Sequence, residues 1–110
     1  MKFNVDVVRI RENSIQLNGW AIGKTPEAAI SYDVEDENHK HLEHKYVATR
    51  RDDVSQIYFG SVIDREFGFD IQFPYERGKD YYLVIRWRIT NGFPAARLAS
   101  ISSLDVNVKE

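Results

Sequence analysis

Three histidines, the only ones in the chain, lie close together at His39, His41 and His44. Imidazole nitrogens are frequent zinc ligands, but a zinc site also needs a third convergent ligand and partners that orient the rings. On a strand, His39 and His41 would point to one face and His44 to the other. Glu37 and Glu43 are the carboxylates near enough in sequence to supply a ligand, but the segment is charged and adjoins a turn. We interpret the histidines as solvated surface residues and predict no metal site.

Carboxylates occur in close pairs, Asp52 with Asp53 and Asp64 with Glu66. Two carboxylates on opposite sides of a cleft can hydrolyse a glycosidic bond. Neighbouring positions in a sequence do not define such a cleft, and helix caps and surface charge are sufficient reasons for these pairs. We therefore predict no catalytic residue.

The segment from Gly19 to Thr25 has some features of a phosphate-binding loop. That motif places four residues between its first two glycines and is followed by a helix. Here three residues separate Gly19 from Gly23, and a strand pattern follows. We predict no nucleotide and no other cofactor.

Aromatic side chains with polar neighbours are the better candidates for contacts. Such a ring can stack on a sugar or anchor a protein interface. Trp20 falls on the polar side of its strand, and Tyr82 shares a side with two arginines. The alternatives are that Trp20 belongs to the core, because both sheet faces near a loop can be covered, and that the arginines form a solvated face. The candidate glycan or interface contacts are Trp20, Tyr58, Tyr82, Arg86 and Arg88.

Most of these candidates lie in segments where apolar and polar residues alternate with a period of two. This pattern is typical of half-buried strands. A bulge near Val7-Val8 would keep the first strand's apolar side chains on one face. One short helical turn is expected within 51–58, with Asp52 or Asp53 as its N-cap. The pattern predicts an immunoglobulin-like β-sandwich of about seven or eight antiparallel strands. The expected strands cover about 3–10, 15–21, 30–35, 42–49, 67–73 and 81–89, with one or two more within 98–108.

The chain has 110 residues, which corresponds to a single domain (1–110). A formal net charge of -2 argues against a nucleic-acid partner, and the absence of cysteine excludes disulfides and thiolate metal sites.

No apolar run approaches the roughly 20 residues that span a membrane. We expect a cytoplasmic domain without membrane insertion, of a length compatible with a module excised from a larger protein.

Three short motifs in a fixed order resemble a known family. They are Ile15-Gln16-Leu17-Asn18-Gly19-Trp20-Ala21, then Arg51-Asp52-Asp53-Val54, then Gly68-Phe69. Their combination is similar to the accessory β-sandwich domain found beside family 2 glycosyltransferase domains in bacteria. Those enzymes build cell-wall and capsular polysaccharides, including rhamnose-containing ones, and related modules accompany teichoic-acid polymerases. The resemblance covers the chain from about Val5 to Ile89.

The resemblance implies structural roles for the motif residues. Gly19 would allow close approach where a strand bends, and Trp20 would fill the edge of the sandwich or a domain interface. Arg51 would make a charge-assisted bond and Asp53 would cap a helix. Gly68 would open an apolar strand whose Phe69, like Val54, belongs to the core.

The resemblance also implies a function. The chain would be a non-catalytic accessory module that positions the transferase's catalytic domain, in the same chain, or the glycan acceptor. The parent chain would be the enzyme and would place the module at the inner face of the membrane. Two alternatives remain open: a free-standing carbohydrate-binding module and an immunoglobulin-like protein-interaction domain.

Overall fold

The computed structural model of the chain describes residues 1–88, 94–100 and 107–109, and for Arg88 and the two later ranges it describes the backbone alone. These residues form eight strands and one helix. The elements are β1 (Lys2–Arg11), β2 (Ser14–Ile22), β3 (Ile30–Glu35), β4 (Lys45–Thr49), α1 (Asp52–Phe59), β5 (Gly68–Pro74), β6 (Tyr82–Arg88), β7 (Pro94–Ser100) and β8 (Asn107–Lys109).

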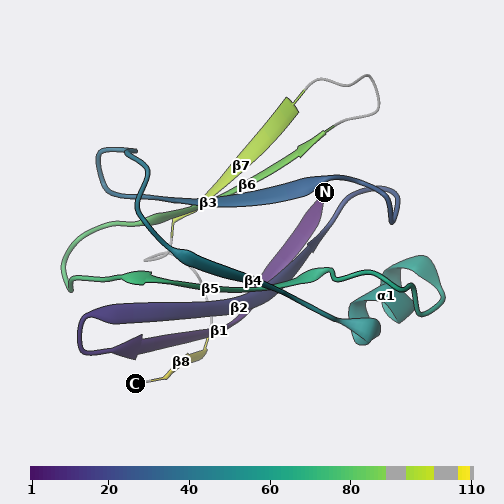
Figure 1. Cartoon of the computed structure of the whole chain (residues 1–110), viewed down its shortest axis with the longest axis horizontal. Helices are drawn as coiled ribbons and strands as arrows, with labels where there is room; N and C mark the ends of the chain where they lie inside the picture. The colour runs from purple at the N-terminus through teal and green to yellow at the C-terminus, as the bar shows by residue number, and fades with distance from the viewer. Residues whose placement is uncertain (89–93, 101–106, 110) are drawn as a thin grey trace.

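The strands form two sheets, one with the order β4-β5-β2-β1-β8 and one with the order β3-β6-β7 (Figure 1). The predicted all-β class is confirmed. All strand pairs are antiparallel except β1 with β8, which is parallel, so the expectation of antiparallel strands throughout is wrong at this edge. Without β8, the strand order equals the ABED and CFG order of constant-type immunoglobulin domains.

The inward-facing side chains of both sheets form one apolar core. Alternation places every second residue of β2, β5 and β6 on the inner face, where water is excluded. The register of β1 shifts between Val5 and Val7, slightly before the predicted bulge, and this shift keeps both Val5 and Val8 in the core. The core contains Val5, Val8, Ile15, Leu17, Ala21, Val34, Phe69, Ile71, Phe73, Tyr81, Leu83 and Ile85.

A buried tyrosine fixes the corner between β5 and β6. The Tyr81 hydroxyl accepts a hydrogen bond from the backbone N–H of Glu76 at 2.9 Å. The Tyr81 ring packs against the rings of Phe73 and Tyr75. A tyrosine at the start of this strand, bonded to backbone a few residues upstream, is the tyrosine corner of immunoglobulin-like sandwiches. Leu83 lies two residues later, where antibody domains have a disulfide cysteine, and is fully buried.

Helix α1 is longer than the single turn predicted, with eight residues. Its N-cap is Arg51, without a side-chain capping bond, so the prediction of Asp52 or Asp53 as the N-cap is wrong. Both aspartates lie in the first turn instead, where negative charge is favourable near the positive end of the helix dipole. Gly60 ends the helix in the left-handed conformation, with a φ of 76°.

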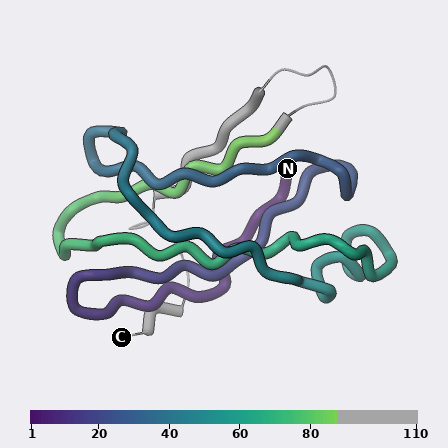
Figure 2. Tube along the Cα trace, in the orientation of Figure 1, coloured from purple at the N-terminus to yellow at the C-terminus, as the bar shows by residue number. Residues whose placement is uncertain are grey.

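The loops gather at the two ends of the sandwich (Figure 2). The β1–β2 turn, the loop after β3 and the loop between β5 and β6 lie at one end, and α1 lies at the other. The predicted break at Asn91-Gly92-Phe93 lies outside the described residues, and Pro94 belongs to β7. No helix among the described residues has the length and apolar character needed to cross a membrane.

Candidate functional site

The predicted contact residues lie in two separate places. Trp20 is in β2 and Tyr58 is in α1, and their ring centroids are 5.2 Å apart. Tyr82 and Arg86 lie on the outer face of β6, beside the histidine segment. Arg88 belongs to β6 by its backbone, and its side chain lies outside the described part.

The three motifs of the family resemblance meet beside α1. In the β2–β5 register Gly19 is opposite Phe69 and Trp20 is opposite Gly68. Gly68 is also opposite Thr49, the last residue of β4, after which the chain enters the Arg51 motif. Segments that are far apart in the sequence therefore lie side by side where α1 begins.

Both motif glycines lie where a side chain has no room. A Cβ at Gly19 would lie 2.2 Å from the backbone oxygen of Asn4 and 2.7 Å from the ring of Phe69. A Cβ at Gly68 would lie 2.1 Å from the Thr49 hydroxyl and 2.7 Å from the Arg51 side chain. Close approach of β1 to β2, and of Arg51 to β5, therefore requires glycine at these two positions.

Arg51 joins the start of α1 to β1. Its guanidinium donates to both carboxylate oxygens of Asp53, with N–O distances of 3.0 Å and 2.8 Å, and also to Asp6 in β1. The paired hydrogen bonds from Arg51 lower the pKa of Asp53 to about 2, and the bonds to Asp53 and Asp6 raise the pKa of Arg51. This bond network with two carboxylates holds the start of the helix against β1.

Ser55 joins α1 to the loop that follows it. Its hydroxyl donates to the Ser61 carbonyl oxygen at 2.7 Å and accepts from the Ile63 N–H at 2.8 Å. Ser55 is completely buried. Polar contacts thus fix the start of the helix to β1 and the loop after the helix to the helix itself.

Helix α1 and the loop after it cover the outer face of β2 and bury Trp20. Only 9% of Trp20 is exposed, so the structure supports the alternative that Trp20 belongs to a core over its use as a stacking platform. The alternation does place it on the outer face, but a second small core encloses it there. This core consists of Trp20, Ile22, Val54 and Phe67, with Phe59 and Ile63 packed against it.

Tyr58 and its neighbours leave an apolar surface at this end. Tyr58 is 40% exposed, Ile57 is 73% exposed and Val62, just after the helix, is 52% exposed. The Lys2 ammonium lies 4.9 Å from the centre of the Tyr58 ring, a cation–π contact. We refer to Ile57, Tyr58 and Val62 as the α1 patch. A carbohydrate-binding role would depend on Tyr58 here.

The histidine segment does not form the expected strand, because β4 begins only at Lys45. His39 lies in the turn after β3 with a φ of 61°, and its ring stacks on Tyr82 with centroids 4.7 Å apart. Strand alternation would place His41 and His44 on opposite faces. In the structure their ring centroids are 5.6 Å apart. Sequence reasoning missed this pair because it assumed strand geometry from Leu42 onwards.

Asp33 of β3 completes a group with these two histidines. Its Oδ1 lies 2.7 Å from His41 Nδ1 and 4.0 Å from His44 Nδ1. Partial burial raises the pKa of Asp33, but hydrogen bonds from His41 and the Val34 N–H outweigh it, and the net pKa is lowered. The turn at 36–40 brings these residues together, and the Asp-Glu-Asn-His turn signal at 36–39 was the clue available in the sequence.

Arg86 places a positive charge beside this group. Its guanidinium lies 3.7 Å from Asp33 Oδ2 and 3.9 Å from a carboxylate oxygen of Glu35. Glu35 also lies 3.3 Å from Nδ1 of His39. The outer face of β3 and β6 is therefore a network of alternating charges.

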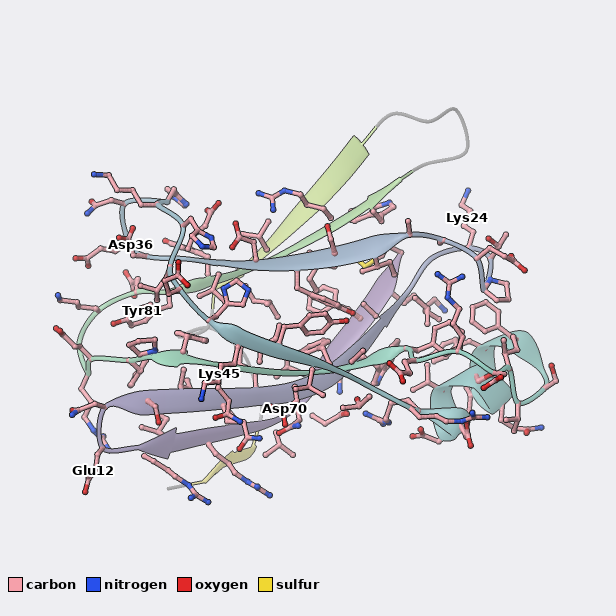
Figure 3. The ribbon with its side chains drawn as sticks, viewed as in Figure 1. Glu12, Lys24, Asp36, Lys45, Asp70 and Tyr81 are labelled. Atoms are coloured by element: carbon pink, nitrogen blue, oxygen red, sulfur yellow. The ribbon has the colours of Figure 1, made fainter. Side chains whose placement is uncertain are left out.

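An open pocket of about 530 Å³ is lined mainly by the loop after β3 and the connection between β5 and β6, two segments that lie at the end opposite α1 (Figure 2). Asp36 and Tyr81, both among its lining residues, are labelled at this end in Figure 3. Its charged lining is mostly acidic, and Lys79 in it forms an ion pair with Glu76 at 2.9 Å. None of the predicted contact residues lines this pocket.

Comparison of the chain with family models, with curated proteins and with solved structures gave no match.

Proposed function

We propose that this chain is a non-catalytic accessory module of a bacterial cell-wall or capsular polysaccharide glycosyltransferase. It positions the catalytic domain of the parent protein, or the glycan acceptor which that domain extends. The α1 patch is the contacting surface, and sugar transfer takes place in the catalytic domain.

The observation that supports this proposal is the meeting of the three motif segments at α1. Gly19 and Gly68 permit the close strand contacts, and Arg51 ties the helix to β1. Residues that define the resemblance thus hold one surface element in a fixed position.

The exposed side of that element has the composition of a binding surface. Tyrosine is a frequent anchor of protein interfaces, because its side chain offers a large contact area and loses little conformational entropy when it is buried. Tyr58 rests on the buried Trp20, and Ile57 is 73% exposed next to it in the helix.

The gene that encodes the chain provides the first test. A family 2 glycosyltransferase domain continuous with these residues is the expected finding. A gene without such a domain would contradict the proposal, as would robust sugar-nucleotide turnover by this chain alone.

Binding to the separately produced catalytic domain provides the second test, by titration calorimetry. Ile57→Ser and Tyr58→Ala should each weaken binding about tenfold or more, since an interface anchor contributes more than about 1 kcal/mol. Val47→Ser is the matched control, because Val47 is 60% exposed but lies in β4. Equal effects of Ile57→Ser and Val47→Ser would exclude the α1 patch as the contact.

An immunoglobulin-like protein-interaction domain is the second candidate, favoured by the strand order and by β4. This strand is at the edge of its sheet, and Tyr46 and Val47 on it are 48% and 60% exposed. An exposed edge can add a strand from a partner. Concentration-dependent self-association that Val47→Lys abolishes, without any binding to a transferase domain, would favour this candidate.

A further inference from the structure

A second candidate site lies at the edge of β3, independent of the α1 patch. One ligand atom from each of Asp33, His41 and His44 lies within 4.8 Å of the other two. We propose that these three side chains bind a divalent transition-metal cation of the zinc type.

The set of donor atoms suits zinc. Two imidazole nitrogens and one carboxylate oxygen, with a water in the fourth position, form a common three-ligand zinc site. Metal–ligand bonds of about 2.0–2.2 Å place tetrahedral ligands roughly 3.4 Å apart. One possible ligand atom of each side chain lies within 4.8 Å of the other two, so small movements suffice to reach this spacing.

His44 has the backbone partner expected of a metal ligand. Its Nδ1 lies 2.9 Å from the Leu42 carbonyl oxygen. A carbonyl oxygen only accepts hydrogen bonds, so Nδ1 bears the hydrogen and Nε2 has the free lone pair. A metal-binding histidine usually donates a hydrogen bond from its second ring N–H to a carbonyl or carboxylate in this way. His44 is 14% exposed, which further restricts its ring.

The other two ligands are also prepared for binding. The Val34 N–H donates to Asp33 Oδ1 at 2.8 Å and orients the carboxylate. The guanidinium of Arg86 lies next to the other oxygen, Oδ2, at 3.7 Å, so a bound cation approaches through Oδ1. His41 is 59% exposed and can rotate toward the ion without disturbing the core.

A bound cation would tie β3 to the connection that leads into β4. These two strands belong to different sheets, so the metal would link the two layers at this edge. Any ligand that binds the folded state alone stabilises it, and zinc should therefore raise the melting temperature.

Zinc titration of the full chain without a histidine tag, followed by calorimetry at neutral pH, tests the proposal. Wild type should bind one zinc ion per chain. Asp33→Ala, His41→Ala and His44→Ala should each lower the affinity by more than about tenfold, since even residues that only support a metal ligand contribute 10–100-fold. His39→Ala is the matched control and should leave the affinity unchanged, because His39 stacks on Tyr82.

Absence of saturable one-to-one binding by wild type would overturn the proposal. An unchanged zinc affinity of His41→Ala would also overturn it. This variant decides the test if His44→Ala does not fold, because His44 is partly buried whereas His41 is exposed. Imidazole NMR signals give an independent readout: zinc should shift the signals of His41 and His44 and leave those of His39 in place, whereas a shift of all three would indicate unspecific binding.

Discussion

Ser55 is fully buried, and its hydroxyl links the Ser61 carbonyl and the Ile63 N–H. A single hydroxyl thus satisfies two backbone groups of the loop after α1. A buried polar group without a hydrogen-bond partner lowers the stability of the fold, because its lost hydration is not replaced. The Ser55 hydroxyl therefore stabilises the loop after α1.

Ser55→Ala should lower the free energy of unfolding by about 1–3 kcal/mol, because it leaves both backbone groups unsatisfied. Urea unfolding followed by circular dichroism measures this. Ser61→Ala is the matched control, since Ser61 contributes only its backbone carbonyl and that group remains. Equal losses in the two variants would show that the hydroxyl is unimportant.

Asp53 makes the stability dependent on pH through its bonds to Arg51. Its pKa is lowered to about 2 in the folded chain, so its contribution is fully present above its ordinary pKa of 3.8 and is lost as the pH falls toward 2. The side chain is 58% exposed, and the contribution should be under about 1 kcal/mol.

The difference in unfolding free energy between wild type and Asp53→Asn should therefore shrink between pH 4 and pH 2. Asp64→Asn, at a side chain that is 98% exposed, removes the same charge as a control and should cause a smaller effect. A difference that stays constant across this range would contradict the role of the Arg51 bonds.

At the level of elements, the strands could be predicted from the sequence and the connections could not. Alternation is a local pattern, and it correctly predicted β2, β3, β5 and β6 to within one or two residues. Helix α1 has only Val54 and Ser55 buried, so it gives little apolar periodicity and was expected as a single turn. The segment 42–44 was wrongly expected to be part of a strand because tertiary contacts with β3, which no local pattern encodes, decide its path.

The β1–β2 contact gives a prediction for an element. Gly19→Ala places a Cβ 2.2 Å from the Asn4 backbone oxygen, and it should destabilise the fold by about 2–4 kcal/mol because backbone must shift. Gly78→Ala is the control: nothing lies within 4 Å of its Cβ, and only its φ of +88° opposes the change, at about 1 kcal/mol. Thermal and urea unfolding measure both, and equal losses would contradict the close approach at Gly19.

At the level of the whole molecule, the two sheets and their shared core were predictable, but the placement of surface features was not. The predicted contact residue Trp20 is buried because α1 covers the outer face of β2, and only the folded chain reveals that cover. Likewise, the two histidines that sequence reasoning placed on opposite faces meet Asp33 after the turn at 36–40. The motifs themselves were visible in the sequence, whereas their meeting at one end of the sandwich depends on strand register.

The proposed contact between the chain and a transferase domain through the α1 patch can be tested by hydrogen–deuterium exchange. Exchange of the chain should be compared with and without the catalytic domain encoded in the same gene. Binding through the α1 patch should slow exchange in the peptide that contains residues 52–62 and leave the 36–44 and 45–49 peptides unchanged. Protection confined to β4 or to the histidine segment, or no protection anywhere, would contradict it.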